Sequence, residues 1–190
     1  MNRRALLRTA AATLVVTACG STATPGGTAT KSPSPSPSAA PASKATVELT
    51  KGGTFTFAFR ADKAPKTVAN FARKSRAGDY DGTTFHRVVP GFVAQGGDPL
   101  SKTLSPGDQR LGTGGGQQET ELSDLPFDKG AVGIARGGDI KVSNDSQFYV
   151  CLDAAPHLNG QYTNFASVTN GMDVVLGIKI GDKIKTIKVE

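Results

Sequence analysis

Apolar and polar residues alternate along several short stretches of the chain, and this is the period of a half-buried β-strand. Two such stretches, Thr46–Leu49 and Thr54–Phe59, are rich in Val, Thr and Phe, and a Lys-Gly-Gly sequence at 51–53 separates them. The spacing predicts a β-hairpin. Every other residue of the second stretch is aromatic, so three rings should share one buried face: Phe55, Phe57 and Phe59.

Two segments have helical rather than strand-like patterns. Apolar and small residues recur every three or four positions within Lys66–Arg76, which predicts an amphipathic helix. Asp62 and Pro65 precede it and indicate where the helix starts, since short acidic residues and proline favour helix N-termini. Asp173–Gly177 is expected to form a second, shorter helical turn.

Further strands are expected at Thr83–Val89 and Phe92–Gln95, on either side of a Pro-Gly turn at 90–91, and at Lys183–Val189. Short strands and glycine-rich loops fill most of the remaining sequence. Many short strands with two helical segments predict an antiparallel barrel or sandwich.

The first residues carry the pattern of an export signal. A basic head with Arg3 and Arg4 precedes a modestly apolar run at Thr9–Ala18, which at about ten residues is well short of the ~20 that span a bilayer. The run ends in Val-Thr-Ala-Cys at 16–19 and resembles the bacterial lipobox, with Cys19 as the lipid attachment site. The arginine pair fits twin-arginine export and general secretion equally well. We therefore expect a signal peptide at 1–19 and a protein tethered to the extracytoplasmic face of a bacterial membrane.

Composition divides the remaining chain into a linker and one domain. Residues 20–43 are Gly, Ser, Thr, Ala and Pro with a single charge, Lys31, so they cannot bury apolar surface and should form a disordered spacer. Residues 44–190 are long enough for one domain. The formal net charge of the 190 residues is +6, but basic residues do not interleave with aromatic ones in a stripe, so a nucleic-acid partner is not expected.

The most informative stretch is Phe-His-Arg-Val-Val-Pro-Gly-Phe-Val-Ala-Gln-Gly-Gly-Asp at 85–98. Strict strand alternation predicts that Phe85, Arg87 and Val89 share one face. His86 should then lie on the opposite face, as a hydrogen-bonded structural residue.

The Pro-Gly turn can bring Phe92 and Gln95 back beside Arg87. A guanidinium, an amide and a ring on one sheet face make a candidate site, and no nucleophile is among them. Here the sequence resembles the cyclophilin family. Two other runs resemble it as well, Ser-Gln-Phe-Tyr-Val at 146–150 and Leu-Asn-Gly-Gln at 158–161, as does Lys-Thr-Val-Ala-Asn-Phe at 66–71.

The resemblance implies a mainly β fold, an eight-stranded antiparallel closed barrel capped by two α-helices, and peptidyl-prolyl cis-trans isomerase activity without a metal or cofactor. It also implies roles for individual residues. Arg87 would be catalytic with Gln95 holding it or the substrate carbonyl. The remaining residues would bind substrate: Phe92, Val93, Tyr149 and Leu158 around the proline ring, Gln147, Gly137 and the Arg136 backbone along the flanking peptide, and His157 and Tyr162 at the rim.

These residue types suit the chemistry. Resonance holds the X-Pro amide planar behind a barrier of ~18–20 kcal/mol, and twisting localises a lone pair on the proline nitrogen. An arginine beside that nitrogen would favour the twisted form over the planar one.

We expect proline-containing polypeptides as partners, with folding of exported proteins as the role, and a monomer. His157 stands where many eukaryotic cyclophilins carry Trp, which implies only weak cyclosporin binding. The alternative is a non-catalytic module or scaffold that holds proline-containing segments in the same groove at the cell surface.

Overall fold

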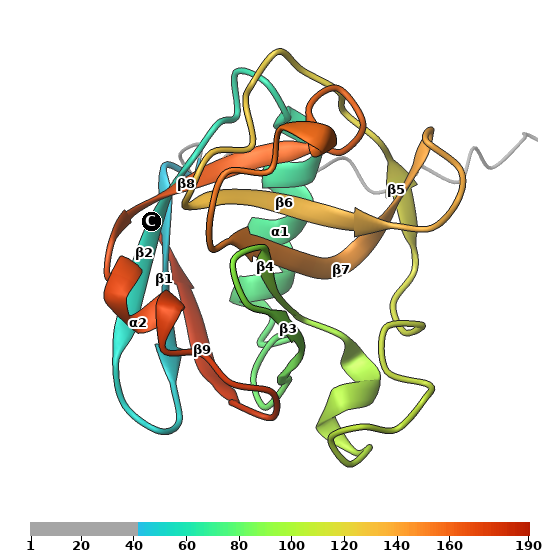
Figure 1. Cartoon of the computed structure of the whole chain (residues 1–190). Coiled ribbons are helices and arrows are strands. Elements are labelled where there is room, and N and C mark those ends of the chain that lie inside the picture. The colour runs from blue at the N-terminus through green and yellow to red at the C-terminus, as the bar shows by residue number, and fades with distance from the viewer. Residues whose placement is uncertain (1–41) are drawn as a thin grey trace, which may run out of the picture. The chain divides into compact units, whose positions relative to one another are not determined.

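The computed structural model of the protein describes residues 42–190. The predicted signal peptide at 1–19, with Cys19, and residues 20–41 of the predicted linker lie outside this range. Within it the secondary structure is mainly β, with two α-helices and two short 3-10 helices (Figure 1). No helix in residues 42–190 has the length and apolar character needed to cross a membrane.

The five strands and two helices that were predicted with bounds agree with the observed ones to within a few residues, whereas β5 to β8 were expected only as unlocated short strands. In chain order they are β1 Lys44–Leu49, β2 Thr54–Phe59, α1 Pro65–Arg76, β3 Phe85–Val89, β4 Val93–Gly96, η1 Pro99–Lys102, β5 Gln117–Glu119, β6 Ala131–Arg136, β7 Val142–Cys151, η2 Pro156–Leu158, β8 Asn164–Asn170, α2 Met172–Leu176 and β9 Ile184–Val189.

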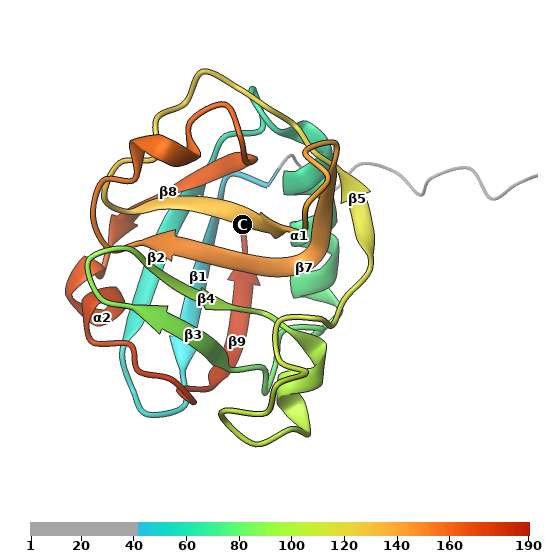
Figure 2. The same ribbon diagram turned by 45° about the vertical axis from the view of Figure 1, so that its right-hand side comes forward.

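Eight strands follow one antiparallel path, β3-β4-β7-β6-β8-β2-β1-β9, and the short β5 pairs with β7 beside it. The path curls so that its two ends meet: Thr84, just before β3, bridges Lys183, just before β9. The Phe85 N–H also donates to the Asp182 carbonyl at 2.9 Å. In Figure 2 the two helices lie on opposite sides of the curled sheet. The predicted antiparallel barrel with two helices is confirmed.

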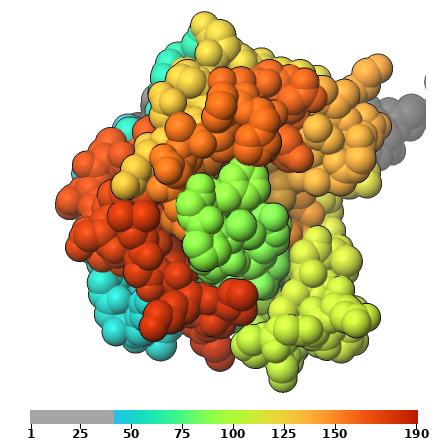
Figure 3. Space-filling model, in the orientation of Figure 1, coloured from blue at the N-terminus to red at the C-terminus, as the bar shows by residue number. Residues whose placement is uncertain are grey.

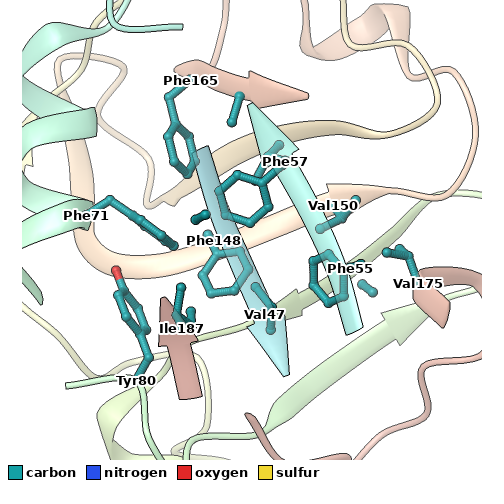
Figure 4. Close-up of a cluster of buried hydrophobic side chains, with 14 of the residues drawn as sticks. Val47, Phe55, Phe57, Phe71, Tyr80, Phe148, Val150, Phe165, Val175 and Ile187 are labelled. Atoms are coloured by element: carbon teal, nitrogen blue, oxygen red, sulfur yellow. The ribbon is translucent and has the colours of Figure 1, made fainter. Parts of the chain in front are cut away.

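The interior of the curled sheet is filled with aromatic rings (Figure 4). Phe55, Phe57 and Phe59 all point inward from β2, as the alternation predicted. The ring of Phe71, from α1, lies 5.7 Å from that of Phe57 and 5.4 Å from that of Phe148 on β7, centroid to centroid, both edge-on. Rings at such separations and angles attract one another beyond simple burial. The helix is thereby locked against the sheet, so the outer face of β7 has a rigid support.

The start of α1 differs from the prediction. Asp62 does not cap the helix: its carboxylate pairs with Arg60, and the N-cap position, Ala64, has no side-chain cap. Instead the carboxylate of Glu121, far along the chain, accepts the backbone N–H groups of Lys66 at 3.0 Å and Thr67 at 2.7 Å. An acidic group at this end satisfies free N–H donors and opposes the positive end of the helix dipole. The cap therefore joins the segment after β5 to α1.

Replacing Glu121 with Ala should lower the free energy of unfolding by about 1 kcal/mol, since two backbone donors lose their acceptor. Chemical denaturation measures the change. Glu119→Ala is the matched control, because Glu119 pairs with Lys66 at the exposed surface and exposed pairs contribute little. Equal effects of the two substitutions would contradict the capping role of Glu121.

Candidate functional site

A β-bulge determines which side chain of β3 reaches the outer surface. Phe85 pairs with Gly96, but Arg87 pairs with Gln95, so His86 is an extra residue that shifts the register. The prediction that Phe85 and Arg87 share a face is therefore wrong: Phe85 is fully buried inside the barrel and Arg87 is exposed. Bulges commonly redirect side chains beside functional sites in this way.

The turn after β3 returns the chain beside Arg87, as predicted. The Phe92 N–H donates to the Val89 carbonyl at 3.0 Å, and Gly91 adopts a φ of 69°, which favours glycine. Phe92 belongs to this turn and not to the strand, contrary to the prediction. Its ring centroid lies 5.8 Å from the Arg87 guanidinium carbon, within cation–π distance. In Figure 3 the green atoms of this hairpin lie at the centre of the face.

Strands β3, β4, β7 and β6 run side by side, as Figure 2 shows, and their outer faces carry the predicted site. Gln95 on β4 lies opposite Tyr149 on β7, which in turn pairs with Gly133 on β6. An apolar cluster outside the barrel underlies this face. Its buried members are Val93, Phe127, Ala131, Tyr149, Cys151, Ala155 and Leu158.

A hollow of about 230 Å³ opens above this apolar cluster. We call it the smaller hollow. It has an apolar floor, polar groups at its edge and two guanidiniums at its rim. Its lining residues are Arg87, Phe92, Val93, Gln95, Ala135, Arg136, Tyr149, Leu158 and Tyr162. Of these, only Ala135 was missed by the sequence analysis, and it is the outward residue of β6 next to the predicted Arg136.

A larger hollow of about 520 Å³ adjoins the smaller one and shares Gln95, Ala135 and Arg136 with it. Two of the predicted residues, Gly137 and Gln147, line this larger hollow. Its other walls come from the glycine-rich segment 112–116, the start of β5, residues 138–139 and the first residues of β7. The residues of these segments were not among the predicted site residues.

Hydrogen bonds connect the two hollows. The Gln95 amide donates to the Gln147 side-chain oxygen at 3.1 Å, and the Gln147 amide donates to the Gly114 carbonyl at 2.7 Å. The carboxylate of Asp98, fully buried, accepts the N–H groups of Leu100 at 2.8 Å and Gly112 at 2.5 Å. Gln147, itself bonded to the glycine loop, thus orients the Gln95 amide. The Gln95 side-chain oxygen is the atom that could accept from the Arg87 guanidinium, but no hydrogen bond joins them, and this oxygen has no donor among the described residues.

Tyr149 forms part of the floor of the smaller hollow, and the position of its ring depends on the absence of a side chain at Gly133. A β-carbon at Gly133 would collide with the Cζ and hydroxyl of Tyr149 and would approach the Phe127 ring to 2.7 Å. The hydroxyl is buried without a hydrogen-bond partner in residues 42–190. Burial raises the pKa of Tyr149, because the charged form would lose its hydration. The floor is thus a neutral, closely fitted surface.

The two histidines and the described cysteine do not form a catalytic group. His157 lies outside both hollows, with its ring 5.2 Å from that of Phe92. His86 was predicted to be hydrogen-bonded, but neither ring nitrogen has a partner among the described residues, and burial lowers the pKa of His86. Burial raises the pKa of the Cys151 thiol to about 12, so it stays protonated. Residues 42–190 contain no group of three or more His, Cys, Asp or Glu placed to hold a metal ion.

Replacing Gly133 with Ala should lower the free energy of unfolding by about 1–3 kcal/mol, because the added methyl forces the Tyr149 ring from its seat. Gly138→Ala is the matched control, since a β-carbon there meets nothing within 4 Å. Urea denaturation of both variants measures the difference. If Gly133→Ala were as stable as Gly138→Ala, the close fit of Tyr149 would not determine the shape of the floor.

Comparison with known proteins agrees with this geometry. A family model described as cyclophilin type peptidyl-prolyl cis-trans isomerase/CLD matches residues 45–189. The peptidyl-prolyl cis-trans isomerase B of Bacillus subtilis is 39% identical over 146 residues, which cover 75% of this chain and 94% of the relative. A probable peptidyl-prolyl cis-trans isomerase of Brucella abortus is 43% identical over 138 residues, 70% of each chain.

Solved structures show the same fold. The crystal structure of a cyclophilin type peptidyl-prolyl cis-trans isomerase of Cryptosporidium parvum has a TM-score of 0.67 and 26% identity, and covers 78% of this chain and 98% of its own. A second structure of that protein, in the presence of the dipeptide Ala-Pro, has a TM-score of 0.66 and 25% identity, covering 77% and 98%. On the family match, the relatives and the fold together, this chain belongs to the cyclophilin-type peptidyl-prolyl cis-trans isomerases.

Proposed function

We propose that this peptidyl-prolyl cis-trans isomerase stabilises the twisted X-Pro amide with Arg87 and assists the folding of proteins outside the cytoplasm. The observation that carries the mechanism is the position of the Arg87 guanidinium. It lies at the rim of the apolar smaller hollow, 5.8 Å from the Phe92 ring, and no carboxylate among residues 42–190 pairs with it.

In this mechanism the proline ring enters the smaller hollow and packs on Phe92, Val93, Tyr149 and Leu158. The ring is apolar, so its burial supplies binding energy without a charged partner. The amide to be rotated then lies at the rim, where the guanidinium can donate a hydrogen bond to the proline nitrogen. That nitrogen accepts strongly only when the amide is twisted, so the bond stabilises the transition state more than the ground state.

The magnitude of the arginine contribution can be bounded. A charge-assisted hydrogen bond contributes about 1.5–3 kcal/mol, which corresponds to about one to two powers of ten in rate. The remaining acceleration comes from fixing the substrate. Gln95, oriented by Gln147, offers its free oxygen to a peptide N–H beside the proline, and the Arg136 and Gly137 segment lies along the adjoining groove.

Arg87→Ala in the full chain should reduce kcat/KM for an Ala-Pro peptide at least tenfold, since the guanidinium proposed to donate to the proline nitrogen is removed. Arg87→Lys should recover part of the loss, because it keeps the charge but not the rigid fork. Arg110→Ala is the control, because this arginine pairs with Asp108 outside both hollows.

Exchange spectroscopy on the cis and trans peptide signals separates catalysis from mere holding. Exchange peaks that vanish in Arg87→Ala support the mechanism. Shifts of the substrate signals without exchange in the unsubstituted protein would support the alternative of a non-catalytic binding module, and undiminished exchange in Arg87→Ala would rule out the arginine mechanism.

The proposed site of action rests on the sequence at 1–19. A basic head, a short apolar run and a lipobox-like end at Cys19 support export and lipid attachment. Uncatalysed prolyl isomerisation takes tens to hundreds of seconds and can limit folding. A tethered isomerase would therefore act on exported chains as they fold at the membrane surface.

Expressed in a bacterium, the Cys19→Ser variant should move from the membrane fraction to the soluble extracytoplasmic fraction, because the acylated thiol is lost. Fractionation and metabolic labelling with a fatty acid measure the change. Cys151→Ser is the control, since this thiol is buried in the folded domain. Retention of Cys19→Ser in the membrane would show that Cys19 is not the anchor.

A further inference from the structure

The two hollows together form one groove, which we call the site groove. It carries two guanidiniums that have no acidic partner among the described residues. Neither Arg87 nor Arg136 lies within salt-bridge distance of a carboxylate among residues 42–190. Of the four other arginines in the described residues, Arg60 pairs with Asp62 and Arg110 with Asp108, each through two N–H donors. Arg73 and Arg76, exposed on α1, have no carboxylate partner there either, but they lie outside both hollows. The proposed mechanism accounts for the unpaired charge of Arg87. It does not account for that of Arg136.

Arg136 is nevertheless held in a defined position by neutral groups. Its Nε donates to the Gln161 carbonyl at 2.9 Å and its Nη1 to the Gly137 carbonyl at 2.8 Å. The guanidinium carbon lies 4.4 Å from the ring centroid of Tyr162, a cation–π contact. Carbonyls and a ring orient the group without neutralising it, and Nη2 has no acceptor among the described residues. A fork fixed in advance loses less entropy when it binds an anion.

Arg136 also lies where a substrate must pass. Together with Gln95 and Ala135 it lines both hollows, so a peptide with its proline in the smaller hollow and a neighbouring residue in the larger one runs across it. Consecutive Cα atoms are about 3.8 Å apart, which brings a side chain within one or two residues of the proline into reach.

The charge of the groove favours an acidic residue next to the substrate proline. The lining of the two hollows contains two arginines and a single carboxylate, Asp139. Asp139 is exposed and accepts the Lys141 N–H at 2.8 Å. The rest of the larger hollow is lined by glycines and uncharged side chains. Asp139 is thus the one lining anion that could compete with an incoming carboxylate, and it forms no ion pair with Arg136.

We propose that Arg136 makes this isomerase select proline segments with Asp or Glu within two residues of the proline. The inference rests on the proposed function, because it concerns the same groove. The carboxylate would accept one or two N–H hydrogen bonds from the guanidinium. Such hydrogen bonds are charge-assisted. Because Arg136 is only half-buried, solvent weakens the attraction, and the expected preference is about threefold to tenfold.

The test uses pairs of peptides that differ only by Glu or Gln at one position: two before, one before, or one after the proline. The ratio of kcat/KM within a pair isolates the charge, since the two side chains have nearly the same shape. With the full chain at low salt, at least one pair should give a ratio of about three to ten. The ratio should approach one in Arg136→Gln and in high salt, which screens the charge.

Two variants keep the test decisive. Arg136→Lys retains a charge without the fork and should keep part of the preference, whereas Arg110→Gln, outside the groove, should keep all of it. Should Arg136→Gln fail to fold, Arg136→Lys and the salt dependence of the unsubstituted protein carry the test. Ratios at or below one for every pair would overturn the proposal, as would a ratio unchanged by Arg136→Gln.

Failure of this inference and failure of the proposed mechanism have different signatures. If the protein isomerises the Gln peptides and Arg87→Ala does not, the proposed mechanism is supported. This holds whatever the ratio of kcat/KM between the Glu and Gln peptides. If no peptide is turned over, the mechanism fails. The dissociation constants of the Glu and Gln peptides, measured by titration, then test the selection by Arg136, with equal constants overturning it.

Discussion

The site depends on one extra residue in one strand. Because His86 shifts the register of β3 against β4, Phe85 stays in the core while Arg87 emerges at the groove. Without the bulge, alternation would place the two side chains on the same face, and either a ring would leave the core or a guanidinium would enter it. Burying an unpaired guanidinium costs several kcal/mol. The bulge therefore lets a packed core and a charged groove share a single short strand.

Features with a local signal could be predicted from the sequence. The inward rings of β2, the helix at Lys66–Arg76 and the Pro-Gly turn each follow from a repeating pattern or a residue with restricted backbone geometry. The bulge could not be predicted in this way, because a register shift is a property of two paired strands. The cap on α1 escaped for a similar reason: Glu121 is 55 residues from Lys66, and nothing near the helix indicates it.

The candidate site shows the same division. Family motifs indicated most residues of the smaller hollow, because their order along the chain is distinctive. The contacts that orient them were not visible in any motif. Gln95 is oriented through Gln147 by the carbonyl of Gly114, and that loop is held by the buried carboxylate of Asp98. Each link joins segments far apart in sequence, so only the folded chain shows how the Gln95 amide is oriented.

The groove separates two physical tasks. Its floor, with Tyr149 seated against Gly133, is apolar and uncharged, and can exclude water from a proline ring. Its charges stand at the rim, where solvent still reaches both guanidiniums, which have no acidic partner among the described residues. An acidic residue beside Arg87 would have stabilised the free protein but would compete with the twisted amide for the same donor. In the proposed mechanism, the absence of such a partner within residues 42–190 leaves the guanidinium available to the twisted amide. The same reasoning applies to the role proposed for Arg136: carbonyl groups and the Tyr162 ring fix its direction without neutralising its charge.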